Sequence, residues 1–148
     1  MTTDRIATQA PEEVAARLSV VLGQLIRVLR RQTPVTIGPG SLAALATLHR
    51  CGPLRLGDLA LREGVAPPTL TRMVAVLEEG GHLTRRPDPD DRRAVQVSIT
   101  AAGSELVESA LGARAVVLQA RLAALPDDAR QALVRALPAL EALADDAL

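Results

Sequence analysis

The sequence predicts a mainly α-helical protein with one small β-hairpin, and two observations support this class. Along most of the 148 residues, apolar side chains recur three and four positions apart, the spacing of a helix with one buried face. Residues 94–99 instead alternate apolar and polar side chains, as a half-buried strand does. The length suits one domain with a substantial core better than two, so we expect a single domain over residues 1–148.

The first two expected helices lie in the N-terminal third of the chain. Residues 11–31 carry a stripe of valines and leucines at helical spacing. The segment TPVTIGPGS then interrupts the pattern with prolines and glycines. The second helix is expected to begin at Ser41, a plausible N-cap, and to end at His49, just before a Gly-Pro pair.

Two shorter helices follow, joined by a tight turn. Residues 56–63 have helical spacing, and Gly64 suits the left-handed backbone conformation that ends many helices. Residues 67–79 form the next expected helix, because two prolines are tolerated at its first positions, where their missing N–H groups matter least. The glycine pair at residues 80–81 ends it.

A concentrated charged turn separates two expected strands, residues 82–86 and 94–99. The nine residues RRPDPDDRR hold four arginines, three aspartates and two prolines. After the second strand, Thr100 is expected to cap a long helix that extends to about residue 125. The motif PDD starts a last helix, which we expect Pro138 to kink or to end early, because proline removes a backbone donor and clashes with the preceding turn.

Composition excludes several classes of protein. The chain has no Phe, Tyr or Trp, which argues against modules that stack RNA or single-stranded bases on aromatic side chains. All 17 basic residues are arginines and 17 acidic residues balance them, so any nucleic-acid binding must come from local placement of charge. No apolar run approaches the roughly 20 residues that span a bilayer, and the N-terminus has no signal pattern, so we expect a cytoplasmic protein without a membrane partner.

Residues that carry metal or catalytic chemistry are scarce. Cys51 is the only cysteine and there are two histidines, which excludes an intramolecular disulfide and a four-ligand zinc site within one chain. The sequence contains no recognisable nucleophile–base pair and no phosphate-binding glycine loop. We therefore expect no catalytic residues, no metal and no cofactor, and a protein that is not an enzyme.

The order helix, tight turn, helix, hairpin over residues 56–99 carries the functional signal. Two short helices joined at a glycine occur in many folds. When a two-stranded hairpin follows them, the arrangement is typical of a reader of double-stranded DNA. Its second helix enters the major groove, and the hairpin, or wing, reaches the adjacent backbone or minor groove.

This segment resembles the winged helix-turn-helix of MarR-type transcriptional regulators over residues 42–103. The resemblance rests on Leu59-Ala60 in the first helix, PPTLTRMVAVLEEGG in the second, DPDDRR at the wing, and SIT followed by Gly103. It implies that residues 38–100 form a winged helix-turn-helix DNA-binding lobe. It also implies that residues 11–31 and 101–147 supply N- and C-terminal dimerisation helices.

The flanking helices have two interpretations. Their apolar stripes could simply cover the core of the same chain. Three long aliphatic helices outside a compact lobe nevertheless offer more apolar surface than one copy can easily hide, which favours a homodimer matched to a pseudo-palindromic operator. The resemblance implies a small anionic or phenolic effector between these helices and the lobe. Some relatives sense oxidants through a cysteine near the chain start, but Cys51 lies elsewhere and the chain has no tyrosine to accompany it.

On the second helix of the motif, the positions that face away from the expected core are Pro68, Thr69, Thr71 and Arg72. The two threonines suit phosphate or base-edge contacts, and Arg72 can reach a guanine edge or a phosphate. Thr69 could equally be a residue without a special role in the helix. Ala66 stands where the family often has a capping serine, so one cap and one phosphate contact are lost.

At the wing, the predicted DNA-binding residues are Asp91, Arg92 and Arg93. The negative potential of a narrow minor groove attracts arginine, and a neighbouring carboxylate can direct the guanidinium. Asp91 and Arg93 match the Asp-x-Arg wing pair of the family, which implies that Arg93 enters the groove and that Asp91 orients it. The alternative is a solvated hairpin turn with weak surface ion pairs.

These expectations lead to two functional hypotheses. The first is a homodimeric, sequence-specific and ligand-responsive repressor of transcription that binds double-stranded DNA. The alternative is a winged-helix module for dimerisation or protein interaction that no longer binds DNA. The arginines at positions 72 and 93 favour the first hypothesis, because a lost DNA-binding surface has no need of them.

Overall fold

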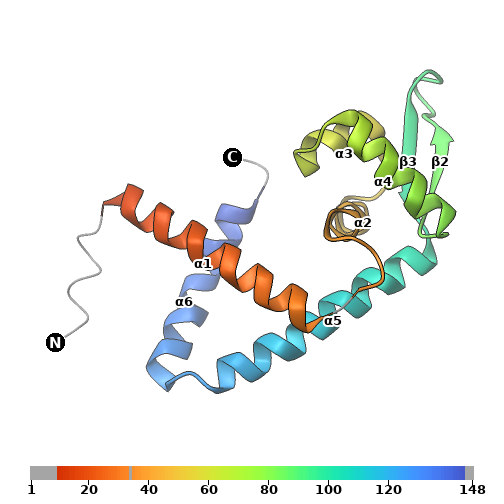
Figure 1. Ribbon diagram of the computed structural model, residues 1–148. Helices are drawn as coiled ribbons and strands as arrows, with labels where there is room; N and C mark the ends of the chain where they lie inside the picture. The colour runs from red at the N-terminus through yellow and green to blue at the C-terminus, as the bar shows by residue number, and fades with distance from the viewer. Residues whose placement is uncertain (1–9, 34, 146–148) are drawn as a thin grey trace.

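The computed structural model describes residues 10–33 and 35–145, and their elements confirm the expected class, mainly α-helical with a small antiparallel sheet (Figure 1). In chain order the elements are α1 (Pro11–Gln32), α2 (Pro39–Cys51), β1 (Leu54–Arg55), α3 (Leu56–Glu63), α4 (Pro67–Glu79), β2 (Leu83–Pro87), β3 (Val95–Ile99), α5 (Ala101–Ala123) and α6 (Asp127–Ala144). Positions 1–9, 34 and 146–148 of the expected single domain lie outside the described residues, and with them positions 146–147 of its expected terminal helix.

Helix α2 begins earlier than the sequence suggested. Ser41 is not its N-cap: the helix starts at Pro39 and Gly38 precedes it as the capping residue. Proline fits the first helical position because its fixed φ angle is already helical and its absent N–H would have no partner there. The segment of prolines and glycines thus contains both the break after α1 and the first residues of α2.

The sheet has three strands rather than the expected two. Its order is β1-β3-β2, and both pairings are antiparallel. Strand β1 contributes only two residues, with Leu54 opposite Val97 and Arg55 opposite Gln96. Two residues are too few to show the alternation of apolar and polar side chains that marks a strand. The pairing of β1 with β3 therefore becomes visible only in the folded structure.

The core lies between α2, α3, α4, the sheet and the first half of α5. Leucines at positions 45, 48, 59, 70 and 77 are fully buried there. On β3, Val97 is fully buried, whereas Val95 and Ile99 on the same face are only partly covered. Thr100 caps α5 as expected, because its hydroxyl oxygen accepts the N–H of Gly103 at 3.1 Å.

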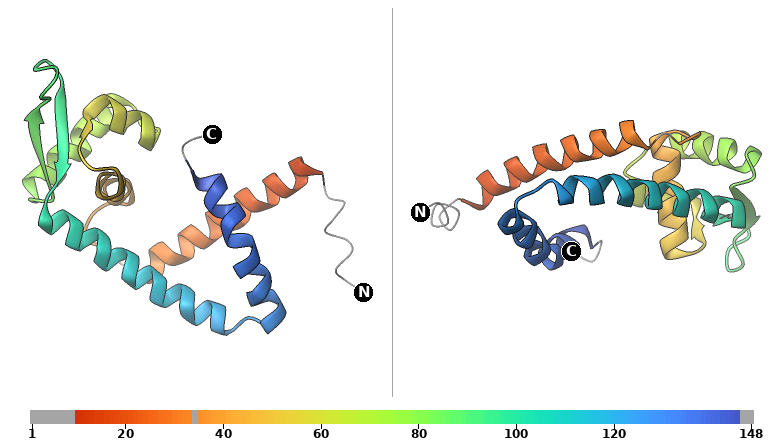
Figure 2. Two further views of the ribbon diagram at one scale, coloured as in Figure 1. Left: turned by 180° about the vertical axis from the view of Figure 1, so that it is seen from behind. Right: turned by 90° about the horizontal axis from the view of Figure 1, so that it is seen from below.

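Helices α1, α5 and α6 extend from this lobe (Figures 1 and 2). Neither α1 nor α6 buries a residue, and the buried residues of α5 lie in its first half. The expectation that Pro138 ends α6 early is wrong, since the helix continues through it to Ala144. The helix is rich in alanine and leucine on both sides of Pro138, and these strong helix formers offset the loss of one backbone hydrogen bond. None of the helices within residues 10–33 and 35–145 combines the length and apolar character needed to cross a membrane.

Candidate nucleic-acid interface

A tight turn at Gly64 sets the angle between α3 and α4. Gly64 has φ of 62°, a left-handed conformation that costs glycine little. Its N–H donates to the carbonyl of Leu61, and the N–H of Val65 donates to that of Ala60 at 3.1 Å. Because these bonds occupy the last carbonyls of α3, the chain turns at once into α4.

Helix α4 buries one face and exposes the other. Leu70, Val74 and Leu77 are fully buried. The predicted contact residues on the opposite face, Pro68, Thr69, Thr71 and Arg72, are all exposed.

Two local details modify the chemistry of this surface. The Thr71 hydroxyl donates its hydrogen to the carbonyl of Pro67 at 2.9 Å. The hydroxyl oxygen can therefore act towards a ligand only as an acceptor. Ala66 occupies the N-cap position of α4 without a side-chain cap, as its sequence implies. The first backbone N–H groups of the helix therefore have no side-chain acceptor of their own.

An ion pair joins the end of α4 to the base of the wing. The Nε of Arg85 on β2 donates to Glu78 Oε2 at 2.7 Å, and the backbone N–H of Arg85 donates to Oε1 at 3.2 Å. The side-chain hydrogen bond from Arg85 holds the pKa of Glu78 below its ordinary value. This contact connects the C-terminal end of α4 with β2, the first strand of the hairpin, and the two elements lie side by side (Figure 1).

Asp88 organises the wing loop from within. Although it belongs to the charged turn, it is only 3% exposed. Its Oδ1 accepts the N–H groups of Asp90 and Asp91, both at 2.9 Å. The loop is closed by a hydrogen bond of 2.9 Å from the N–H of Asp88 to the carbonyl of Ala94.

Arg55, from β1, completes the contacts of Asp88. Its Nε donates to Oδ2 at 2.8 Å and its second terminal nitrogen donates to Oδ1 at 3.0 Å, a two-pronged pairing. This guanidinium, and next the N–H of Asp91, hold the pKa of Asp88 well below its usual range. Sequence reasoning missed both residues. An aspartate at the start of a turn is a recognisable signal, but nothing in the sequence connects it to an arginine on a separate strand.

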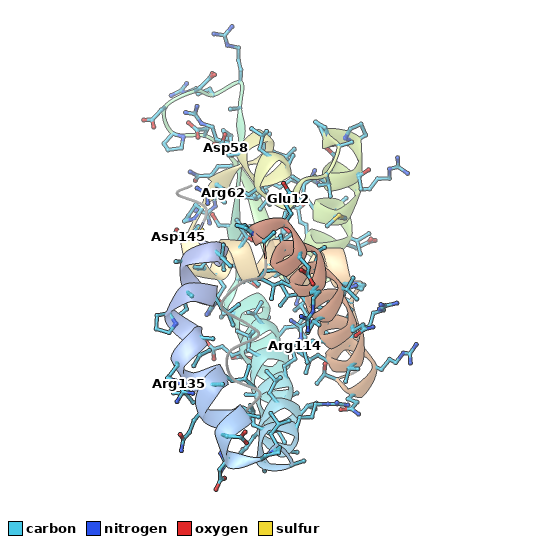
Figure 3. All side chains as sticks on the ribbon, turned by 90° about the vertical axis from the view of Figure 1, so that its left-hand side faces the viewer. Glu12, Asp58, Arg62, Arg114, Arg135 and Asp145 are labelled. Carbon is cyan, nitrogen blue, oxygen red and sulfur yellow. The ribbon has the colours of Figure 1, made fainter. Side chains whose placement is uncertain are left out.

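The predicted wing residues lie at the tip of the hairpin, in solvent. The side chain of Arg93 is 95% exposed. Asp91 Oδ1 accepts the backbone N–H of Arg93 at 3.0 Å and lies 3.7 Å from its Nε. Arg92 is exposed beside them. The structure thus brings Asp91 and Arg93 together in the loop between β2 and β3. This end of the hairpin projects beyond the helices of the lobe (Figures 1 and 3).

A second feature lies where α1 and α5 meet the lobe. Two adjoining cavities of about 190 and 200 Å³ share Arg30, Pro39, Leu42 and Arg114 in their walls. Within the described part of the chain, the buried Nε of Arg114 has no hydrogen-bond partner. Figure 3 labels Arg114 on α5, beside α1. The cavities are apolar for the most part and carry two guanidinium groups.

The surroundings of Cys51 and the placement of possible metal ligands are the remaining features that the sequence singled out. Cys51 is exposed, and a terminal nitrogen of Arg62 lies 3.9 Å from its Sγ. Across residues 10–33 and 35–145, no three His, Cys, Asp or Glu side chains gather closely enough to hold a metal ion.

A helix that exposes threonine and arginine after a tight turn, followed by a hairpin with arginines at its tip, defines a winged helix-turn-helix DNA-binding protein. Comparison with known families agrees with this class. The MarR family profile matches residues 37–95. The chain belongs to the MarR family of transcriptional regulators.

Individual relatives extend the match over most of the chain. The uncharacterized HTH-type transcriptional regulator Mb0904 of Mycobacterium bovis is 40% identical over 134 residues, 90% of this chain and 94% of the relative. The HTH-type transcriptional repressor MdtR of Bacillus subtilis is 29% identical over 92 residues, 62% of this chain and 59% of that protein. The crystal structure of RV1404 from Mycobacterium tuberculosis aligns with a TM-score of 0.73 and 25% identity, covering 90% of this chain and 93% of that one.

Proposed function

We propose that this DNA-binding regulator acts as a homodimeric repressor that recognises a pseudo-palindromic operator and responds to a small anionic effector. The observation that carries the proposal is that one lobe presents two exposed contact sets, on α4 and at the wing tip. The exposed side chains of Arg72 and Arg93 lie one on each of these elements, where a recognition helix and a wing would meet DNA.

In the proposed complex, α4 lies in the major groove. Pro68, Thr69, Thr71 and Arg72 face the DNA, with Arg72 as the longest reach to a guanine edge or a phosphate. The wing lies over the neighbouring minor groove, where Arg93 enters, Asp91 holds its backbone, and Arg92 lies near a phosphate.

The proposed dimer uses the helices that bury nothing in a single copy. Helices α1 and α6 expose large aliphatic side chains along their length, a surface that a second copy can cover. Among these side chains are Val20, Val21, Leu22, Ile26, Leu133, Val134, Leu137 and Leu143. Twofold symmetry then places two α4 helices on half-sites whose centres are about 10 base pairs apart.

The effector is proposed to bind in the cavities lined by Arg30 and Arg114. A buried guanidinium nitrogen without a partner attracts an anion, and the apolar walls suit a small hydrophobic body. Occupation of this junction between the lobe and the helices would change the spacing of the two α4 helices. Repression is consistent with the relative MdtR, which is named a repressor.

DNA recognition is tested by selecting operators from genomic fragments and measuring the affinity of the full-length protein for the best site. Arg93→Ala is expected to weaken binding by roughly 1–3 kcal/mol, the scale of one good groove contact. The control is Arg121→Ala, which removes one exposed arginine from the last turn of α5. Equal losses in the two variants would show that the wing adds only bulk charge. Failure to select any DNA would instead favour the interaction-module hypothesis.

The role of Asp91 is tested by a double-mutant cycle. Asp91→Ala should weaken binding less than Arg93→Ala, because it frees the arginine without removing it. The double variant should lose little more than Arg93→Ala alone, since coupled neighbours are not additive. Full additivity would retain Arg93 as a contact and remove Asp91 as its orienting residue.

The effector site is tested with benzoate as an anionic probe and benzamide as its neutral counterpart. Benzoate should lower operator affinity, and benzamide should not. Arg114→Ala should abolish the response, whereas Arg121→Ala, on the same helix, should keep it. A response to both probes, or one that survives Arg114→Ala, would contradict an anion site at these cavities.

A further inference from the structure

We propose that Arg55 is a positioning residue for the DNA-binding wing: it holds the Asp88 carboxylate, which shapes the loop that presents Arg93. The inference rests on the proposed contact between the wing and DNA, and it assigns a role to a residue outside both the recognition helix and the wing. Arg55 lies on the edge strand β1, opposite Gln96 near the loop end of β3, and its effect is expected at the tip of the hairpin.

The first step is the anchor. Arg55 lies on β1 opposite Gln96 of the central strand β3, so the paired sheet fixes its backbone. From there the guanidinium reaches across to the residue that follows β2. It contacts both carboxylate oxygens of Asp88, at 2.8 and 3.0 Å, and this two-point contact fixes the direction of the carboxylate as well as its place.

The second step is the loop. The Asp88 carboxylate accepts two hydrogen bonds from Arg55 and two more from the N–H groups of Asp90 and Asp91. With its side chain only 4% exposed, this charge depends on protein partners in place of water. Removal of Arg55 would leave a desolvated carboxylate, which can recover hydration only if it turns outward and releases the loop.

The third step connects the loop to Arg93. Asp91 takes part in both sets of contacts: its N–H donates to Asp88, and its carboxylate accepts the N–H of Arg93. A continuous series of hydrogen bonds therefore connects Arg55, through Asp88 and Asp91, to the backbone N–H of Arg93. A loop that is already ordered in the free protein loses less conformational freedom when its arginine binds DNA.

A competing role for Arg55 must be separated from this one. Its side chain is 45% exposed, and one terminal nitrogen has no part in the contact with Asp88, so it could also touch a DNA phosphate itself. A positioning residue and a phosphate contact predict different behaviour when Arg93 is absent. That difference decides between them.

The test measures operator affinity of the full-length protein well below its melting temperature. Arg55→Ala should weaken binding roughly tenfold, the coupling expected within one hydrogen-bonded network. Arg55→Lys should give an intermediate loss, because an ammonium group keeps the charge but cannot make the two-pronged contact. In the Arg93→Ala background, Arg55→Ala should cost less than about twofold, since there is no groove arginine left to position. The control is again Arg121→Ala.

A second readout follows the loop in the free protein and needs no DNA. Hydrogen exchange at the amides of Asp90 and Asp91 should become faster in Arg55→Ala and stay unchanged in Arg93→Ala. Asp88→Asn is the supporting variant, because its amide oxygen can still accept the two loop N–H groups but carries no charge to hold the guanidinium. It should fold, lose affinity, and loosen the loop less than Arg55→Ala does.

Three outcomes would overturn the inference. Unchanged affinity in Arg55→Ala would show that the anchor does not matter for DNA. An additive loss in the Arg93→Ala background, with a shallower salt dependence, would make Arg55 a phosphate contact. Unchanged amide exchange would break the step from Arg55 to the loop. If instead the wild-type protein binds no DNA while the loop amides still respond to Arg55→Ala, it is the proposed function that fails, and the loop anchor stands without a role in DNA binding.

Discussion

The DNA-binding lobe and the helices that extend from it are both rich in valine and leucine but bury them differently. In the lobe, Leu45, Leu48 and Leu59 are completely inaccessible to solvent. On α1, the 22-residue helix with the most regular apolar stripe, no residue is buried. The lobe can therefore be stable within one chain, whereas α1 and α6 acquire comparable burial only through a partner.

This difference predicts two kinds of stability in one protein. Unfolding of the lobe should depend on its own packing and be independent of protein concentration. The stability of the extended helices should rise with concentration if, as we propose, a second copy covers them. Variants in the two regions can separate these contributions.

The largest effect is expected in the lobe. Leu45→Ala removes a fully buried side chain at the centre of the core. It should lower the free energy of unfolding by about 2–5 kcal/mol, because the lost burial is compounded by the cavity left behind. Chemical denaturation at two protein concentrations should give the same loss. A loss below 1 kcal/mol would mean that the core is looser than its burial indicates.

The next effect concerns the extended helices. Leu22→Asp on α1 changes a side chain that is 42% exposed in a single copy. If a partner covers it, light scattering should shift from twice 15.5 kDa toward 15.5 kDa, because burial of one leucine contributes about 1.5–3 kcal/mol and the new charge would be desolvated. Gln24→Asp, the same change at an exposed polar position of α1, should leave the mass unchanged. A wild-type protein that is monomeric at micromolar concentration would contradict the proposed dimer.

The sequence predicted the lobe better than the contacts that shape it. Spacing, Gly64 and Thr100 located α3, α4 and α5 within a few residues, because helix periods and terminal residues are local signals. The two-residue strand β1 and the bond from Arg55 to Asp88 were missed, since both depend on partners distant in the sequence. The family resemblance placed Arg93 at the wing, and the structure shows its side chain exposed there.

Two helix boundaries failed for local reasons. Pro39 was counted with the break before α2, and Pro138 was expected to kink α6 or to end it early. A proline can begin a helix, and an otherwise favourable helix can continue past one. Whether a proline ends a helix depends on the residues around it, and the sequence reasoning gave those residues too little weight. The residues proposed to contact DNA, and Asp91 beside Arg93, could be named from the sequence. Arg55 and Asp88 could not, because their contact joins residues that are far apart in the chain.

A smaller effect compares the lobe and the extended part of one helix. A Cβ added at Gly103 would lie 2.1 Å from the carbonyl oxygen of His82, whereas one added at Gly112 meets nothing within 4 Å. Gly103→Ala should therefore cost about 1–3 kcal/mol of stability through forced displacement of backbone. Gly112→Ala should stabilise α5 by roughly 0.5–1 kcal/mol, the gain of alanine over glycine within a helix. Thermal unfolding of both variants would check this, and a neutral Gly103→Ala would show that α5 can shift away from the sheet. A destabilising Gly112→Ala would place Gly112 against a partner in the dimer.

The smallest expected effect concerns how the contact between Arg55 and Asp88 depends on pH. The pKa of Asp88 is lowered in the folded protein, first by the Arg55 hydrogen bond, so this contact stabilises the fold above the ordinary aspartate pKa of about 3.9 and is lost as pH falls through the folded value. The difference in unfolding free energy between wild type and Asp88→Asn should be constant from pH 8 to 5 and should shrink below about pH 4. In the Arg55→Ala background the decline should begin at the same pH, set by the unfolded chain, but should be smaller and should end at higher pH, because the largest cause of the lowered pKa is gone. Urea denaturation across this range measures both curves. A difference that already vanishes between pH 7 and 5 would mean that another group titrates, and one that persists unchanged to pH 2 would mean that the charge of Asp88 contributes nothing to the stability of the wing.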